Sequence, residues 1–166
     1  MADPVFARVA IIGAGLIGSS IARAARAFDA AGTISIYDAA PEVMARVRAL
    51  DLAEEASGHV GAAIAGADLV VICTPVGACG AVARTIAPFL ALGAIVSDVG
   101  SVKSAVVAQV APALPSHAHF IPAHPIAGTE FSGPDAGFAD LFRNRWCILT
   151  PPADAHAERV GRLSAF

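Results

Sequence analysis

"VAIIGAGLIGSSIARAARAF", residues 9–28, joins a short apolar run to a helical stretch through three glycines spaced as G-x-G-x-x-G. Between a strand and a helix, this spacing is typical of a dinucleotide-binding fold. The first glycine permits a tight turn, the second lets backbone approach a pyrophosphate, and the third lets the helix pack closely on the strand. Glycines that only serve a turn are the alternative. The expected cofactor contacts are Gly13, Gly15, Leu16, Ile17 and Gly18, with the phosphates on the N–H groups of the helix start.

An acidic residue at the end of the next strand bears on which dinucleotide binds. Asp38 follows Gly18 by 20 residues, where a carboxylate meets the hydroxyls of the adenosine ribose. A 2′-phosphate would be repelled there and would need a cation close by, whereas the nearest downstream cation is Arg46. The sequence therefore favours NAD over NADP.

Short strand-like runs alternate with helical stretches on both sides of this unit. The expected strands are Val9–Ile12, Thr33–Tyr37, Leu69–Cys73, Ala94–Ser97, His119–Pro122 and Trp146–Leu149, all read as buried, with one weak strand between Ala53 and Ala63. The expected helices are Leu16–Ala30, Pro41–Leu50, Ala78–Leu90 and Val102–Val110. This alternation predicts an α/β fold of the Rossmann type, a doubly wound, mainly parallel sheet with helices on both faces. Thr74 and Pro75, at the end of the fourth strand, either lie beside the cofactor or form an ordinary turn.

Composition excludes several other classes of protein. A formal charge of −3 with 6% aromatic residues gives neither a basic footprint nor stacking platforms for nucleic acid. No uninterrupted apolar stretch is long enough to span a membrane, and the first residues lack the basic start and apolar core of a signal peptide. Three widely spaced cysteines do not suggest a disulfide framework, so we expect a cytoplasmic protein.

The loop "IPAHPIAGTEFSGP", residues 121–134, places groups that handle protons among glycines and prolines. In the usual 3-2-1-4-5-6 strand order the fifth and sixth strands are neighbours, so Ser101 and His124 are expected to emerge side by side at the cofactor edge. A histidine oriented by a hydroxyl and facing a nicotinamide can accept the proton of a substrate hydroxyl. His117 and His119 lack the nearby cysteine or carboxylate that would complete a zinc site with His124, so we expect no metal.

"GAGLIGSS", "SDVGSVK" and "HPIAGTE" followed by "SGP" resemble the prephenate and arogenate dehydrogenases of tyrosine biosynthesis, in the family's order from Val9 to Pro151. The resemblance implies NAD(P)-dependent oxidative decarboxylation of prephenate or arogenate, with hydride transfer to the nicotinamide and loss of carbon dioxide. By position, His124 is the family's hydrogen-bond acceptor for the ring hydroxyl and Ser101 orients it. Thr129 and Glu130 belong to the substrate loop. Lys103 lies either near the substrate carboxylates or as a solvated lysine at a helix start.

Members of this family also carry a helical domain that forms a homodimer and supplies an arginine for the substrate carboxylate. We therefore expect residues 1–152 to form the dinucleotide-binding domain, 153–166 to begin a connecting helix, and this chain alone to be weakly active or inactive. Leu163 and Phe166 share a face of that last helix with nothing downstream to cover it. A hydroxyacid dehydrogenase of the 6-phosphogluconate dehydrogenase type and a non-catalytic NAD-binding module are the alternatives.

Overall fold

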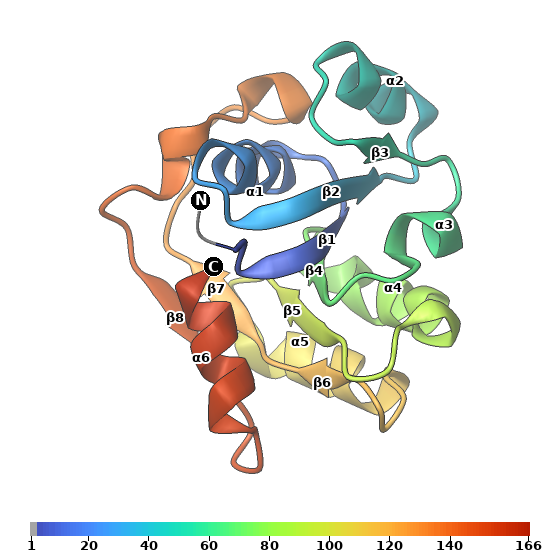
Figure 1. The fold of residues 1–166 in the computed structure, drawn as a ribbon, viewed down its shortest axis with the longest axis vertical. Helices are drawn as coiled ribbons and strands as arrows, with labels where there is room; N and C mark the ends of the chain where they lie inside the picture. Colours follow the sequence, from blue (N-terminus) through green and yellow to red (C-terminus); the bar gives the residue numbers. More distant parts are fainter. Residues whose placement is uncertain (1–2) are drawn as a thin grey trace.

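A six-stranded parallel sheet forms the centre of the fold in the computed structural model, which describes residues 3–166 (Figure 1). The strand order is β3-β2-β1-β4-β5-β6, and every neighbouring pair is parallel. The strands are β1 (Phe6–Ile12), β2 (Ala31–Tyr37), β3 (Glu55–Ala56), β4 (Leu69–Ile72), β5 (Ile95–Asp98) and β6 (His119–Phe120). The predicted doubly wound Rossmann-type sheet is confirmed.

Helices cover both faces of this sheet because successive side chains of each central strand point to opposite sides. On β1, Val9 and Ile11 contribute to one core and Ala10 and Ile12 to the other. The first core also holds residues of α1 (Leu16–Ala27), α2 (Pro41–Ala49) and α6 (Ala157–Ala165). The second holds residues of α3 (Val60–Ile64), α4 (Cys79–Ile86) and α5 (Lys103–Val110). Within residues 3–166, no helix combines the length and apolar character needed to cross a bilayer.

Several helices differ from their predicted bounds. The expected helix at residues 78–90 is α4 flanked by two 3-10 turns, η1 (Val76–Ala78) and η2 (Ala87–Phe89). Pro88 in the first turn of η2 cannot donate a backbone hydrogen bond to α4, which explains the break. The short helix α3 was not predicted. Further 3-10 turns are η3 (Ala111–Ala113), η4 (Pro134–Ala136) and η5 (Ala139–Phe142).

The predicted strand His119–Pro122 ends early, and its continuation leaves the parallel sheet. Ile121 still donates its N–H to the Val96 carbonyl, 2.9 Å away, but Pro122 has no N–H to offer. The chain then forms β7 (Ala123–Pro125), which pairs antiparallel with β8 (Cys147–Leu149) in a separate sheet. The expectation that His124 ends the sixth parallel strand was therefore wrong.

The predicted strand at residues 146–149 was also expected to be buried, which the structure contradicts. Only Cys147–Leu149 pairs as β8. Trp146 is 83% exposed and Ile148 is 50% exposed. An apolar run can equally be a buried strand or an edge that faces outward, and β8 is the second kind because it lies outside the central sheet.

The apolar face of α6 is packed against the first core, contrary to the expectation that it would be uncovered. Leu163 is 8% exposed within the first core, and the Phe166 ring meets the Phe6 ring edge-to-face with centroids 5.6 Å apart. Arg162 donates its Nε to the Val5 carbonyl at 2.9 Å and lies 4.3 Å from the Phe6 ring centroid. α6 therefore packs on the same face of the sheet as α1 and α2, whereas α5 packs on the opposite face.

Candidate active site

The glycine turn between β1 and α1 has the geometry that a bound pyrophosphate requires. Gly13 has φ +102°, a conformation that L side chains rarely adopt. A Cβ on Gly18 would stand 2.0 Å from the carbonyl oxygen of Gly13, so a side chain there would separate helix from strand. A Cβ on Gly15 would meet no heavy atom within 4 Å. The turn is thus tight where helix meets strand and open where backbone would approach a phosphate.

The Asp38 carboxylate joins the end of β2 to this turn. One oxygen accepts the Ala14 N–H and the other the Ala40 N–H, each at 2.9 Å. A carboxylate has about four acceptor positions, so both oxygens keep capacity for ribose hydroxyls. Asp38 is therefore held in place by backbone and remains able to bind a sugar.

Arg46, the cation nearest downstream of Asp38, is already paired. Its Nε lies 2.8 Å from both carboxylate oxygens of Asp135, and this pair raises the pKa of Arg46 and lowers that of Asp135. Asp135 belongs to the segment 126–146 that connects β7 with β8, which we call the strap. A guanidinium with two carboxylate contacts is less available to a 2′-phosphate than a free one.

The strap crosses over α1, the helix that begins at the glycine turn (Figure 1). Phe138 donates its N–H to the buried Ser20 hydroxyl at 3.1 Å, and Arg23 donates to the Pro134 carbonyl at 3.2 Å. Thr129 and Glu130, predicted as substrate-loop residues, are exposed at the beginning of the strap. The strap thereby links the segment that holds Thr129 and Glu130 to α1.

Thr74 and Pro75 lie at the carboxyl end of β4, as the strand pattern predicted. A Cβ on Gly13 would come within 3.2 Å of the Thr74 side chain, so Thr74 is a direct neighbour of the glycine turn. Pro75 is exposed and immediately precedes η1. Both residues therefore flank the edge where a cofactor would lie, and their contact with it stays a prediction.

His124 is half-buried on β7, and a backbone carbonyl orients its ring. Nδ1 lies 3.2 Å from the carbonyl oxygen of Val99, the residue that follows β5. Because a carbonyl can only accept, the neutral ring carries its proton on Nδ1 and leaves Nε2 as an acceptor. Among the described residues no hydrogen bond joins Ser101 to His124, and Ser101 is exposed. The expected orienting contact from Ser101 is replaced by the Val99 carbonyl, and a role for Ser101 toward substrate stays a prediction.

Asp98 and Lys103 form a buried ion pair next to the backbone that precedes His124. The Asp98 side chain is 0% exposed and that of Lys103 19% exposed, and the two are in direct contact. Lys103 also donates to the Ala123 carbonyl at 2.6 Å. Lys103 is therefore not a solvated lysine at a helix start, because its ammonium group lies between β5 and β7.

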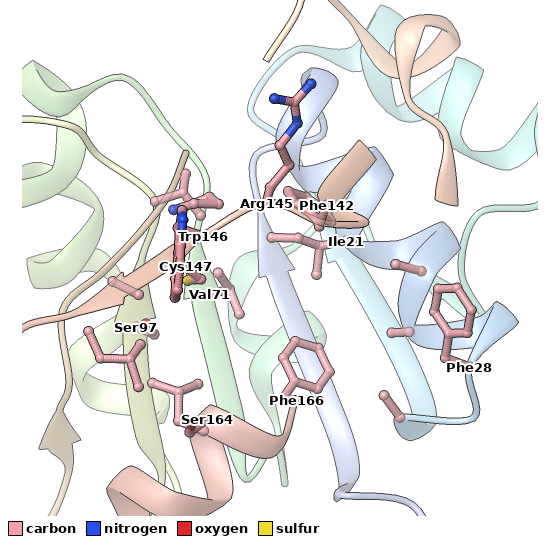
Figure 2. Close-up of a pocket in the computed structure, with 18 of the residues that line it drawn as sticks. Ile21, Phe28, Val71, Ser97, Phe142, Arg145, Trp146, Cys147, Ser164 and Phe166 are labelled. Atoms are coloured by element: carbon pink, nitrogen blue, oxygen red, sulfur yellow. The ribbon is translucent and has the colours of Figure 1, made fainter. Parts of the chain in front are cut away.

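A cavity of about 450 Å³ is lined by residues of α1, β8 and α6 (Figure 2). Ile21 and Phe28 of α1, Phe166 of α6 and Trp146 beside β8 are among its lining residues. None of the glycines of the turn, nor Ser101 or His124, lines it. The cavity is mostly apolar, with Arg143 and Arg145 among its few charged groups, and it does not coincide with the residues predicted to do chemistry.

Comparison with protein families identifies this arrangement. Residues 21–166 match the family model described as the nucleotide-binding domain of prephenate dehydrogenase. This chain belongs to the prephenate dehydrogenase family. Sequence relatives agree: it is 45% identical over 162 residues to a cyclohexadienyl dehydrogenase of Zymomonas mobilis, covering 98% of this chain and 55% of the relative. It is 30% identical over 156 residues to a prephenate dehydrogenase of Bacillus subtilis, covering 93% of this chain and 42% of that protein.

Solved structures of dehydrogenases share the fold. Prephenate dehydrogenase from A. aeolicus, in complex with hydroxyphenyl propionate and NAD+, superposes with a TM-score of 0.86 at 29% identity, over 96% of this chain and 55% of that one. Arogenate dehydrogenase from Synechocystis gives a TM-score of 0.86 at 27% identity, over 95% and 55%. The chain spans about half the length of the relatives that it matches. A nicotinamide dinucleotide is the cofactor that family membership and the glycine geometry together support.

The sequence did not reveal the groups that hold His124 in place. The Val99 carbonyl carries no side-chain signal, so composition and motifs could not have shown it. Asp98 could have been noticed, because a carboxylate at the end of an apolar strand directly before Val-Gly-Ser-Val-Lys needs a partner once buried. Ser20 and Asp135 gave no signal before the path of the strap was known.

Proposed function

We propose that the protein containing this chain oxidatively decarboxylates a cyclohexadienol such as prephenate or arogenate, using NAD. The placement of His124 supports this most directly. It lies beside the end of β5, on the edge of the sheet where the glycine turn and β4 also end, with Nε2 free to accept a proton. A relative is named cyclohexadienyl dehydrogenase, and solved neighbours are named for prephenate and arogenate.

The nucleotide end fits an NAD molecule. Gly13, Gly15 and Gly18 leave backbone N–H groups at the start of α1 for the pyrophosphate, with Leu16 and Ile17 as first helical residues. Asp38 would bind the adenosine ribose. A 2′-phosphate would face the charge of Asp38 without a free Arg46, which supports NAD over NADP. Bound at this edge, NAD supplies a nicotinamide that accepts hydride.

At the chemical end, His124 accepts the hydrogen bond of the substrate hydroxyl through Nε2 and takes its proton as the carbon is oxidised. The Val99 carbonyl holds the ring in the tautomer that this task needs, because it fixes the proton on Nδ1. Loss of the ring carboxylate as carbon dioxide then leaves an aromatic phenol. Ser101, Thr129 and Glu130 are exposed, and they are the groups of this chain that we assign to substrate.

The decisive experiment is NAD reduction by the intact gene product, assayed separately with prephenate and with arogenate at saturating NAD. We expect turnover with at least one substrate and formation of one carbon dioxide per NADH. NAD binding without turnover of either substrate would overturn the enzymatic proposal and favour a non-catalytic NAD-binding module. Turnover of linear hydroxyacids in place of both ring substrates would favour another class of dehydrogenase.

A further inference from the structure

Asp98 is the last residue of β5, and its buried carboxylate contacts groups that lie outside the parallel sheet. One oxygen accepts the Gly100 N–H at 2.8 Å and also contacts the Lys103 ammonium. The other accepts the Ala123 N–H at 3.3 Å. Burying a charge is unfavourable unless it is paired and hydrogen-bonded, and here both conditions are met. The carboxylate therefore brings together the end of β5, the start of α5 and the start of β7.

Lys103 completes the same connection from the other side. Its ammonium group lies between the Asp98 carboxylate and the Ala123 carbonyl, at 2.6 Å from the latter. Both backbone groups of Ala123 are thus bound by side chains, the N–H by Asp98 and the carbonyl by Lys103. A cation at the first position of α5 is opposed by the helix dipole, so the helix itself does not account for a lysine there.

The residue held in this way precedes His124. Pro122 ends the parallel ladder, so from Ala123 onward no backbone bond to β5 keeps the chain beside that strand. The partner of β7 is β8, whose outer residues are exposed. The hydrogen bonds of Asp98 and Lys103 with Ala123 therefore take the place of the missing backbone bonds between β5 and β7. They lie next to the point where His124 contacts the Val99 carbonyl.

We propose that Asp98 and Lys103 are positioning residues, a paired clamp on Ala123 that sets the distance from the His124 ring to the cofactor edge. This inference rests on the proposed function for its catalytic consequence, although the clamp itself can be measured without turnover. Neither residue is assigned contact with substrate or reacting atoms. Their effect on the reaction passes through the placement of His124.

Three variants of the intact gene product test the clamp: Lys103→Met, Asp98→Leu, and the double variant. Each single variant leaves one buried charge without its partner and is expected to lose stability. The double variant removes both charges and is expected to regain most of that stability. If the pair positions His124, kcat stays at least ~10-fold below wild type in the double variant, because the Lys103 tie to Ala123 is still missing. KM for NAD should stay within about twofold, since the glycine turn is untouched.

Arg8→Met is the matched control, because Arg8 forms an ion pair with Glu55 of β3, the strand at the opposite edge of the sheet from β6, with contacts of 2.6 and 2.7 Å. It should lower stability with kcat unchanged. Amide hydrogen exchange at Ala123 gives a readout that needs no turnover. In the double variant, Ala123 should exchange at least ~10-fold faster than in wild type under conditions where core amides of β1 are unchanged.

Recovery of both stability and kcat in the double variant would overturn the positioning role and leave a merely structural ion pair. Unchanged protection of Ala123 in the double variant would overturn the clamp itself. A wild-type protein without turnover would instead contradict the proposed function, and the exchange experiment would still decide whether Asp98 and Lys103 hold β7.

Discussion

The two ends of the candidate site are built in opposite ways. At the nucleotide end, the turn depends on the absence of side chains, since Gly18 leaves no room for a Cβ and Gly13 has a left-handed backbone. At the chemical end, β7 has left the parallel ladder, and side chains of Asp98 and Lys103 hold it beside β5. The first end is a property of local backbone, and the second depends on contacts between residues at least 20 positions apart. Disturbing one end should therefore leave the other largely intact.

The largest effect should come from His124→Asn in the intact gene product. We expect kcat to fall by at least ~10²-fold, because the hydroxyl loses its proton acceptor, while NAD affinity stays within about twofold, because the nucleotide end is separate. Steady-state rates with each ring substrate and calorimetry with NAD measure the two quantities. His117→Asn is the control, since His117 is exposed and its ring contacts the Leu90 carbonyl away from the site. Turnover within a few-fold of wild type would remove His124 from the reaction.

The next effect tests the nucleotide end with two alanine substitutions. Gly18→Ala should lower the free energy of unfolding by about 1–3 kcal/mol, because the new Cβ would meet the Gly13 carbonyl. Gly15→Ala should change it by less than about 0.5 kcal/mol, because its Cβ enters open space. Both should weaken NAD binding. Urea unfolding and calorimetry distinguish them, and equal stability losses would contradict the geometry of the turn.

Cofactor choice should respond more modestly to Asp38→Asn. The amide keeps a hydrogen-bond acceptor but removes the charge that opposes a 2′-phosphate, so the preference for NAD over NADP should narrow by about tenfold, or 1.4 kcal/mol. Binding constants for both dinucleotides measure the preference. Asp29→Asn, an exposed position with φ +53° that asparagine tolerates, should leave it unchanged. No preference in the wild type would refute the argument from Asp38 and Arg46.

The smallest expected effect is a pH dependence of stability that arises from His119 in β6. Burial, followed by the charges of Arg159 and His156, lowers the pKa of His119 below its ordinary value of 6.5. The unfolded chain then binds more protons than the folded one near that value, so stability should decline slightly as the pH falls through about 6.5. Urea midpoints at pH 7.5 and 5.5 measure this. His119→Gln should reduce the difference, and an unchanged difference would show that His119 does not contribute.

The nucleotide end could be predicted in detail because its signals are local. Gly13 to Gly18 specify a turn, Asp38 follows at the spacing of a strand–helix–strand unit, and the alternation of short strands and helices indicates the strand order. Each of these features depends on neighbours in sequence or on a repeating period. The structure places all of them at one edge of the sheet.

Prediction was wrong where tertiary contacts override a local pattern. The run from His119 to Pro122 has the composition of a strand, but Pro122 ends the ladder and a carboxylate from β5 receives the next N–H. Leu163 and Phe166 indicated an uncovered helix face, and only the position of α6 over the sheet shows that Phe6 and the first core bury it. In both cases the deciding partner lies far away in the sequence.

The sequence by itself determined the fold class and the glycine turn and led to the prediction that His124 is the catalytic histidine, since periodicity, glycine spacing and motif order are properties of neighbouring residues. Tertiary structure decided what holds that histidine. The Val99 carbonyl orients its ring, Asp98 and Lys103 bind the backbone before it, and the strap returns to α1 through Ser20. These contacts form only after the sheet has brought β5 and β7 together, because hydrogen bonds and ion pairs depend on distances in space that residue order does not encode.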